Sequence, residues 1–293
     1  MPDYQTIGLL RNPDADVSTV LPVIFGYLAE RYTVVLDKSC AHLQTENANV
    51  VDTQTLGQAD LVVVVGGDGT LLGAGRRLAR YKVPMIGINL GRLGFLVDVS
   101  PDLVIQNLSA MLDGKHDSDH RWLLAATVVR DGQSINQQVA FNDVIVNNDR
   151  QVRMIEFATH IDGQFVNHER ADGMIVCTPT GSTAYSLSSG GPILHPALDA
   201  IGLVPICPHT LSHRPLVISG NSEITLVIDK QSDTSAQVTF DGQENFKLQP
   251  GDEIVIRKAP DQVVTLLHPK RWSFFAILRA KLNWGRSPTS VKR

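Results

Sequence analysis

Residues 61–70 read LVVVVGGDGT, an apolar run that leads directly into a glycine turn carrying one carboxylate, Asp68. A short Val-rich run bounded by glycines is typical of a buried parallel strand, and Leu71, Leu72 and Leu78 after it have helical spacing. We therefore expect the glycine loop to join a strand to a helix. At that place in an open α/β sheet, backbone N–H groups and the helix N-terminus favour an anion, and glycine lets a phosphate approach the main chain.

The glycine spacing excludes two common nucleotide-binding motifs. Gly67, Gly69 and Gly73 miss the G-x-G-x-x-G pattern by one residue, and the chain contains no G-x-x-x-x-G-K-[ST] motif. GGDGT is shared by a kinase superfamily that includes 6-phosphofructokinases, diacylglycerol and sphingosine kinases, and NAD kinases. We predict a phosphate loop formed by Gly66, Gly67, Gly69 and Thr70. A glycine turn without a catalytic role is the alternative that five residues alone leave open.

Length and composition indicate a soluble globular protein. The chain has 293 residues, of which 43% are hydrophobic and 19% charged, and this length favours about two domains. It has no N-terminal secretion signal, and no apolar run approaches the roughly 20 residues of a membrane span. We therefore expect a cytoplasmic protein without a membrane partner. Cys40, Cys177 and Cys207 form no C-x-x-C pair, which favours structural thiols in a reducing compartment.

The C-terminal segment is basic, although the whole chain has a formal net charge of −4. Residues 270–293 contain seven Lys and Arg and no acid, a pattern that is compatible with nucleic acid or an anionic membrane. Trp272, Phe275 and Leu278 nevertheless share one helical face. We predict a helix over residues 270–285 that docks back on the N-terminal domain, and a disordered tail over the last residues, 286–293.

Residues 1–119 alternate strands and helices. Apolar runs at 6–10, 33–36, 61–65 and 83–88 indicate strands. An amphipathic helix between the first two has its apolar residues at Val17, Val20, Leu21, Ile24 and Leu28, and residues 101–112 indicate a connecting helix. This pattern predicts a parallel sheet with crossover helices. Ligands of such sheets bind at the carboxyl ends of the strands, where both GGDGT and the turn Asn89-Leu90-Gly91 occur.

Residues 120–269 have a different pattern, in which short β-branched runs are separated by turns such as Asp162-Gly163. Nine runs indicate strands, at 123–129, 139–146, 154–161, 174–177, 216–218, 224–228, 236–240, 253–257 and 263–267. This spacing predicts an antiparallel, sandwich-like domain. The expected fold class is therefore an N-terminal α/β domain with a parallel sheet, followed by a C-terminal β domain.

A second candidate site is the segment DGMIVCTPTGSTAYSLSSGGP at residues 172–192. It carries seven Ser and Thr hydroxyls, one tyrosine and several glycines behind an apolar run. Few structural loops need so many hydroxyls, whereas a pocket for ribose and adenine would use hydroxyls for hydrogen bonds and a tyrosine for stacking. Ser182 is not a hydrolase nucleophile, because the G-x-S-x-G elbow is missing.

Several other polar residues have two interpretations. Asn142 and Asp143 lie inside a predicted strand, where unpaired polar side chains are costly, so they either form a hydrogen-bond network or face a site. Arg153 and Arg170 could pair with phosphates, although exposed arginines are common. The histidines show no metal-ligand spacing, so we predict no metal site built from protein ligands alone.

Four motifs in this order resemble the NAD kinase family, in particular its proteobacterial members. They are GGDGT at 66–70, NLGRLGFL at 89–96, Asn142-Asp143, and DGMIVCTPTGSTAYSLSSGGPI at 172–193. The resemblance covers most of the chain and becomes weaker over residues 38–58 and 229–262. The stretch Thr-Gly-Ser-Thr-Ala-Tyr after Asp-Gly separates this chain from the lipid and sugar kinases that share GGDGT.

The resemblance implies an activity and a set of site residues. The family transfers the γ-phosphate of ATP to the 2′-hydroxyl of the adenosine ribose of NAD, with a divalent metal, to give NADP; some members accept polyphosphate. Its members have an α/β domain and a β domain with the active site in the cleft between them, and they form homo-oligomers, dimers or tetramers. By matching positions, Asp68 would be the catalytic base, and the NAD-binding residues would be Asp68, Gly69, Asn142, Asp143, Arg153, Arg170, Asp172, Thr183, Ala184, Tyr185, Ser186, Leu187, Ser188 and Gln243.

This assignment agrees with the chemistry of phosphoryl transfer. A secondary hydroxyl is a poor nucleophile near neutral pH, and an ionised aspartate can orient it and accept its proton. We expect Mg²⁺ to arrive mainly with ATP, since the sequence shows no cluster of metal ligands.

The residues leave three other functions open. A diacylglycerol-type lipid kinase has the same loop but would need an apolar surface facing a membrane. A catalytically silent NAD(P)-binding sensor would keep the pocket, although the intact Asp68 argues against it. The basic C-terminal segment could bind nucleic acid, but the rest of the chain is acidic and contains no recognised nucleic-acid module, so we expect no nucleic-acid partner.

Overall fold

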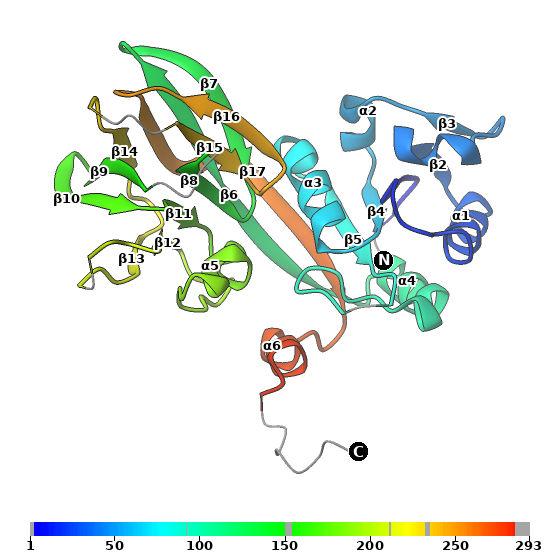
Figure 1. The fold of residues 1–293 in the computed structure, drawn as a ribbon. Helices are drawn as coiled ribbons and strands as arrows, with labels where there is room; N and C mark the ends of the chain where they lie inside the picture. Colours follow the sequence, from blue (N-terminus) through cyan, green and yellow to red (C-terminus); the bar gives the residue numbers. More distant parts are fainter. Residues whose placement is uncertain (1–2, 92, 150–153, 211, 232–234, 285–293) are drawn as a thin grey trace. The chain divides into compact units, whose positions relative to one another are not determined.

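The structure is a computed structural model that describes residues 3–91, 93–149, 154–210, 212–231 and 235–284 (Figure 1). The chain divides into two compact units. Unit 1 comprises Met1–His120 and Val264–Arg293, and unit 2 comprises Arg121–Val263. The division falls inside two long strands, β6 (His116–Arg130) and β17 (Glu253–Pro269), so both strands contribute residues to both units.

Unit 1 is built on a parallel sheet, as predicted. The strand order is β3-β2-β1-β4-β5, followed by residues 265–267 of β17, and each neighbouring pair is parallel. The strands are β1 (Thr6–Arg11), β2 (Thr33–Leu36), β3 (Ala48–Val50), β4 (Leu61–Val65) and β5 (Pro84–Ile88). All five residues of β4 are completely buried. An uninterrupted apolar run is what a strand needs when both faces of its sheet are covered.

Helices cover both faces of this sheet. Ile7 and Val63 point to the face where the core also includes residues of α1 and α4. Gly8 and Val62 point to the opposite face, where the side chain of Leu56 in α2 approaches Gly8. The helices of unit 1 are α1 (Leu21–Ala29), α2 (Thr53–Gly57), α3 (Asp68–Leu78), α4 (Val104–Leu112) and α6 (Phe274–Leu282), with short 3-10 helices η1 (Lys38–Leu43), η2 (Ala79–Tyr81) and η3 (Pro101–Leu103).

Unit 2 consists of two antiparallel sheets packed around one core, which confirms the sandwich-like prediction. One sheet has the order β10-β9-β14-β17, with β6 paired to β17 and β7 to β6; the other has the order β13-β12-β11-β8-β15-β16. Val144 and Val176 of the second sheet share a core with Phe157 and Leu226 of the first. The remaining elements are β7 (Gln133–Ala140), β8 (Asp143–Asn148), β9 (Ile155–Ile161), β10 (Gln164–Ala171), β11 (Gly173–Cys177), β12 (Ala200–Ile206), β13 (Leu216–Ser219), β14 (Ile224–Ile228), β15 (Ala236–Phe240), β16 (Glu244–Leu248), η4 (Gly181–Thr183) and α5 (Tyr185–Ser188).

Some strand boundaries predicted from the sequence are wrong. The run 139–146 is two strands, because the chain leaves β7 at Ala140 and enters β8 of the other sheet at Asp143. Asn142 therefore lies between strands rather than inside one. The runs 253–257 and 263–267 are both parts of β17. Strands β3, β10, β12 and β16 were not predicted.

Helix α6 buries a different face from the one predicted. The helix follows Ser273, whose side chain accepts a hydrogen bond from a backbone N–H of the first turn. This cap sets the start, so Phe274 and Leu278 are buried whereas Phe275 is 58% exposed. The predicted face was therefore wrong at Phe275 and correct at Leu278. The predicted tail, residues 286–293, lies outside the described residues.

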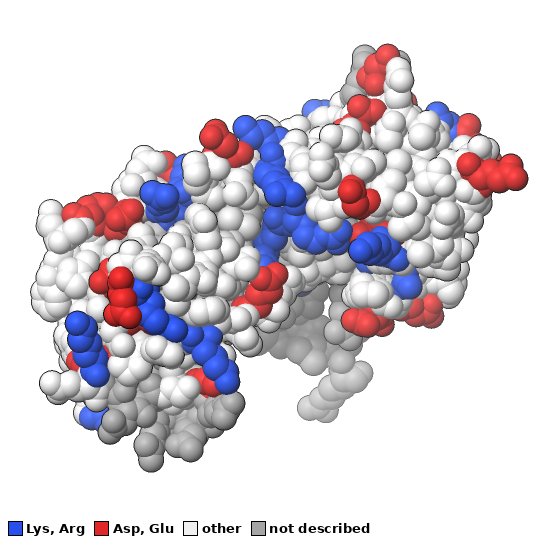
Figure 2. All heavy atoms as spheres, turned by 90° about the horizontal axis from the view of Figure 1, so that it is seen from above, with Lys and Arg blue, Asp and Glu red and all other residues white. Residues whose placement is uncertain are grey.

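The surface charge is mixed, and the helices are short. On the face drawn in Figure 2, Lys and Arg side chains are interspersed with Asp and Glu. Among the described residues, the helices are too short or too polar to cross a bilayer. Cys40 and Cys177 are buried and Cys207 is exposed, and all three are free thiols.

Candidate active site

The GGDGT loop joins β4 to α3, as predicted. Gly67 is the N-cap residue of α3, and Asp68 is the first helical residue. A Cβ at Gly66 would lie 2.5 Å from Oγ1 of Thr70, so this position needs glycine for steric reasons. At Gly67 and Gly69, by contrast, a Cβ would meet no described atom within 4 Å. These two glycines expose backbone at a helix N-terminus, which is a favourable place for a phosphate.

The carboxylate of Asp68 is fixed by the backbone of a second loop. Oδ2 accepts the N–H of Phe95 at 2.8 Å, and Oδ1 accepts the N–H groups of Leu96 at 3.0 Å and Val97 at 3.2 Å. A carboxylate has about four acceptor positions, so one position on Oδ2 is not used by any described residue. Asp68 is only half-buried. Its orientation is therefore set while one oxygen can still accept a proton.

A cavity of about 490 Å³ opens beside the glycine loop. Its walls include Gly67, Gly69 and Thr70 of the loop, together with Arg11 and Arg77. This volume is within the usual range for a site that binds a nucleotide-sized ligand. Two arginines and a glycine loop around one cavity are suited to a ligand that carries phosphates.

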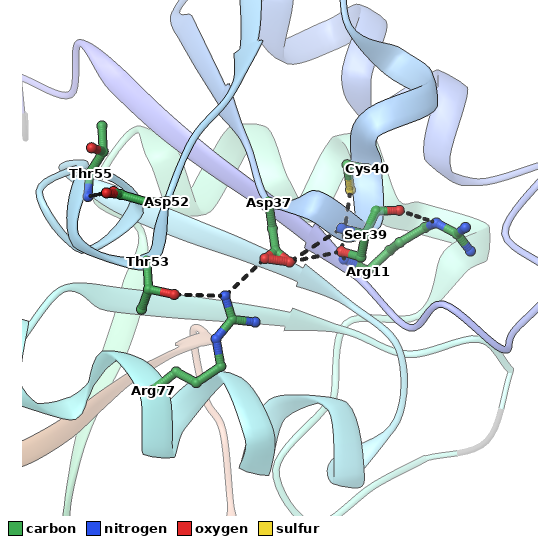
Figure 3. A network of polar contacts seen from close by, with 8 residues as sticks. All are labelled: Arg11, Asp37, Ser39, Cys40, Asp52, Thr53, Thr55 and Arg77. Atoms are coloured by element: carbon green, nitrogen blue, oxygen red, sulfur yellow. Dashed lines mark hydrogen bonds and ion pairs between the residues drawn. The ribbon is translucent and has the colours of Figure 1, made fainter.

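A network of polar contacts holds the arginines of this cavity (Figure 3). Nη2 of Arg77 donates to Oδ2 of Asp37 at 2.9 Å, and Nε of Arg11 donates to the carbonyl of Ser39 at 2.7 Å. Ser39 also donates from its hydroxyl to Asp37, at 3.2 Å. Burial alone would raise the pKa of Asp37, but Arg77 and Ser39 lower it on balance. Asp37 therefore stays ionised and keeps the arginines in place.

In unit 2, Asn142 and Asp143 are part of a backbone turn held by Asp241. The carboxylate of Asp241 accepts the N–H of Phe141 at 2.9 Å, of Asn142 at 2.7 Å and of Asp143 at 3.1 Å. Burial, followed by the charge of Asp241, raises the pKa of Asp143 to about 7. The sequence interpretation missed Asp241, because an Asp-Gly pair after a strand is typical of an ordinary turn.

The hydroxyl-rich segment after β11 uses several of its hydroxyls to hold its own backbone. Thr178 donates to the carbonyl of Phe141 at 2.7 Å, and Ser182 donates to the carbonyl of Pro179 at 2.6 Å. Ser182 also accepts the N–H of Leu194 at 2.9 Å. Composition alone therefore overestimated the number of hydroxyls that face a ligand. The buried Arg121, also missed, donates to the hydroxyl of Thr180.

The other predicted residues of this segment differ in exposure. Tyr185 is 45% exposed, and its ring is available for stacking. Ser188 is exposed, Thr183, Ala184 and Leu187 are half-buried, and Ser186 is completely buried. The side chain of Ser186 therefore cannot reach a ligand without a rearrangement of α5.

The structure brings some predicted NAD-binding residues together and separates others. Asp143 pairs with Cys177, so Asn142 and Asp143 lie at the end of β11 where the turn at Thr178 begins. Gln243 is exposed in the same turn as Asp241. Asp172 precedes the other end of β11, roughly 16 Å away at the usual rise per residue. Arg170 in β10 is exposed and forms an ion pair with Glu156 at 3.5 Å. The last predicted residue, Arg153, lies outside the described residues.

Family models and curated relatives agree on one family. Residues 18–116 match the model of the ATP-NAD kinase N-terminal domain, and residues 141–267 match that of the ATP-NAD kinase C-terminal domain. The NAD kinase of Pseudomonas putida (strain W619) is 46% identical over 289 residues, 97% of this chain and 97% of the relative. This chain belongs to the NAD kinase family. It is accordingly a kinase that phosphorylates NAD to NADP, and the lipid-kinase and silent-sensor alternatives are wrong.

A further relative is also named NAD kinase, and two solved structures have a similar fold. The NAD kinase of Cellvibrio japonicus is 52% identical over 237 residues, 80% of this chain and 79% of the relative. A crystal structure of a NAD kinase from Archaeoglobus fulgidus in complex with ATP is 26% identical, has a TM-score of 0.73, and covers 95% of this chain and 99% of that chain. Yeast NADH kinase complexed with NADH has a TM-score of 0.88 at 24% identity, covers 99% of this chain and 90% of that chain, and shows the shared fold.

Proposed function

We propose that this NAD kinase transfers the γ-phosphoryl group of ATP to the 2′-hydroxyl of the adenosine ribose of NAD, with Asp68 as the general base. The observation that carries the proposal is the carboxylate of Asp68, which three backbone N–H groups hold in one orientation. A base must lie within hydrogen-bond reach of the hydroxyl that it deprotonates. The unused acceptor position on Oδ2 gives the hydroxyl proton a place to go.

The donor nucleotide would occupy the cavity beside the glycine loop. Gly67 and Gly69 give the phosphates access to the start of α3, and Arg11 and Arg77 would neutralise their charge. Phosphoryl transfer asks the protein mainly for positioning and charge neutralisation, which is what these groups provide.

We also propose that Mg²⁺ is the divalent metal and that it enters with the ATP phosphates. Among the described residues, no three His, Cys, Asp or Glu side chains are grouped closely enough to hold a metal by themselves. Mg²⁺ commonly keeps several waters and relies on substrate phosphates, and the hydroxyl of Thr70 is the oxygen group of this loop that would be left for it, because the one unused acceptor position of Asp68 is taken by the ribose hydroxyl. When bound, the ion would neutralise charge on the transferred phosphoryl group.

The acceptor would be held by residues of unit 2. Tyr185 would stack on the adenine, and Asn142 and Asp143 would provide polar contacts from the turn that Asp241 holds. The other proposed NAD contacts are Gly69, Arg153, Arg170, Asp172, Thr183, Ala184, Leu187, Ser188 and Gln243, together with the backbone of Ser186, whose side chain is buried. We propose a homo-oligomeric, cytoplasmic enzyme on the basis of the family resemblance.

The test is Asp68→Asn beside a matched control, Asp102→Asn, which alters an exposed aspartate in η3. NADP formation from NAD, ATP and Mg²⁺ is measured together with NAD binding. We expect Asp68→Asn to bind NAD but to lose about 10²- to 10⁴-fold in kcat, the usual contribution of a general base, while Asp102→Asn behaves like wild type. A kcat of Asp68→Asn within a few-fold of wild type would remove Asp68 from the base role.

A further inference from the structure

Unit 2 contains a cavity of about 220 Å³ whose walls come from both of its sheets. Polar side chains from β9 and β10 line one side of it. Its apolar wall consists of Val166, Met174, Leu203, Pro205 and Leu216. The volume is below that of a drug-sized site, so a ligand here would be a small molecule. The residues of this cavity have no role in the reaction proposed above.

Strand register explains why three polar side chains meet in this cavity. Asn167 of β10 lies directly opposite Thr159 of β9, and Glu169 is two residues further along β10. Residues two apart on a strand point to the same face, so all three point inward, whereas Arg170 points outward. Thr159 is 2% exposed and Glu169 is 4% exposed. A carboxylate is almost never buried to this degree without partners.

Glu169 has partners on one oxygen but not on the other. Nδ2 of Asn167 donates to Oε1 of Glu169 at 2.5 Å, and Nδ1 of His213 lies 3.2 Å from the same oxygen. Oε2 of Glu169, Oδ1 of Asn167 and Oγ1 of Thr159 are all buried without a hydrogen-bond partner among the described residues. Each such atom costs free energy, and a charged one costs most. The cavity therefore presents three unused oxygen acceptors, one of them on a carboxylate.

We propose that this cavity binds a small organic cation, an alkylammonium or alkylguanidinium ion. The nitrogen of the ligand would donate to Oε2 of Glu169, Oδ1 of Asn167 and Oγ1 of Thr159, because an ammonium group has three donors and no acceptor. Its short alkyl chain would contact Met174 and Leu203 on the apolar wall. Hydrogen bonds to an ionised carboxylate are stronger than neutral ones, so Glu169 provides most of the binding energy.

A histidine and an arginine border the cavity and limit the kind of ligand. Nδ1 of His213 lies 3.2 Å from Oε1 of Glu169 without forming a hydrogen bond, and Arg214 is an exposed residue whose Nη1 donates to the carbonyl of His213. Solvent screens an exposed guanidinium, so the buried charge that a ligand meets is that of Glu169. An anion would meet an unpaired carboxylate oxygen and is therefore excluded from the inner end.

The test uses the full chain and four probes of one length: butylammonium, butylguanidinium, butanol and butyrate. Binding is measured by calorimetry and by backbone amide shifts of Thr159 and Asn167. The variants are Glu169→Gln, which keeps the shape of the side chain but removes its charge, and the control Glu223→Gln, which removes an exposed carboxylate of unit 2. Thr159→Val is a second variant that keeps the carboxylate and removes one acceptor.

We expect the two cations to bind wild type and Glu223→Gln with the same affinity, and to shift the backbone amide signals of both Thr159 and Asn167. Glu169→Gln should weaken binding by about ten- to a hundredfold, the usual worth of a hydrogen bond to a charged group, and Thr159→Val should weaken it by less. If Glu169→Gln fails to fold, the affinity of Thr159→Val and the amide shifts of wild type still test the proposal. The proposal would be overturned if butanol or butyrate bound as tightly as the cations, if neither Glu169→Gln nor Thr159→Val weakened the binding of the cations, or if neither cation bound at all.

Discussion

The contact between Gly94 and Asp68 allows the position of the catalytic carboxylate to be perturbed without changing its chemistry. A Cβ at Gly94 would lie 2.0 Å from Oδ1 of Asp68 and 2.8 Å from its Cγ. The backbone of Gly94 does not have a positive φ, so alanine can adopt its conformation. The effect of Gly94→Ala is therefore a steric effect on Asp68 rather than backbone strain.

These distances set how far the carboxylate must move. Real Cβ atoms essentially never come closer than 3.0 Å to another heavy atom, so Oδ1 must move by about 1 Å or more from its place 2.0 Å away. A movement of this size breaks or lengthens the bonds to Leu96 and Val97, which are already 3.0 and 3.2 Å long. Misplacing a reacting group by about 1 Å can cost about a hundredfold in rate, which corresponds to about 2.7 kcal/mol.

The assay is steady-state NADP formation, with the Tm measured in parallel. Gly94→Ala should lower kcat about a hundredfold, with a smaller change in the KM for NAD. The matched control is Gly26→Ala in α1, where a Cβ would meet no described atom within 4 Å, and where alanine favours the helix by about 1 kcal/mol. A folded Gly94→Ala enzyme with a kcat within about threefold of the control would refute the reasoning, because it would show that the rate does not depend on how Asp68 is held.

Three further predictions concern charged side chains. Burial alone would lower the pKa of His268, but Asp119 and Asp98 raise it above its ordinary value of 6.5. The stability that protonated His268 contributes is complete below pH 6.5 and is lost as the pH rises through its pKa in the folded state. In wild type this favours a higher Tm at about pH 5 than at about pH 9, and His268→Gln should make that difference in Tm smaller. Burial raises the pKa of Asp143 from 3.8 to about 7. The folded protein therefore keeps the proton of Asp143 at a pH where the unfolded chain loses it, and stability falls as the pH rises from about 4 to about 7. Asparagine resembles the protonated side chain, so Asp143→Asn should raise the Tm relative to wild type more at about pH 8 than at about pH 4. Arg77→Ala should raise the KM for ATP about tenfold and leave the KM for NAD unchanged; an equal change in both constants would contradict the donor site.

The sequence predicted unit 1 well because its signals are local. The run before Gly66 is fully buried between two layers of helices, so its hydrophobicity is continuous and its length is that of a strand. The glycines mark the turn, and the spacing of Leu71 and Leu78 marks the helix. Each signal lies within about ten residues of the element that it defines. None of them depends on a contact with a distant part of the chain.

Unit 2 was harder to predict because distant contacts decide where its strands begin and end. Strand β12 contains Gly202 and Pro205, which argue against a strand in the sequence, yet Pro205 pairs opposite Met174 in a buried sheet. Strand β10 is mostly polar, since one of its faces is exposed and Asn167 and Glu169 on its inner face line a cavity. The break before Asp143 has no local turn signal, because the side chain that stabilises it is far away in the sequence.

The same limit applies to the candidate site. Asp68 and the segment around Tyr185 were predicted, because their motifs are continuous in the sequence. The ion pair between Asp37 and Arg77 joins a turn after β2 to α3, forty residues further along the chain, and neither residue lies in a recognisable motif. Pairs of this kind become visible once the topology of the sheet is known.

Asp241 also has a consequence for the order of folding. Its carboxylate holds backbone groups that lie 98 to 100 residues earlier in the chain, and closing a loop of that length costs about 4 kcal/mol of chain entropy. The turn at Asn142 therefore cannot become ordered with its immediate neighbours. We expect it to form only once β15 has paired with β8, so the polar groups proposed to contact NAD should become ordered later than the local turns of unit 2.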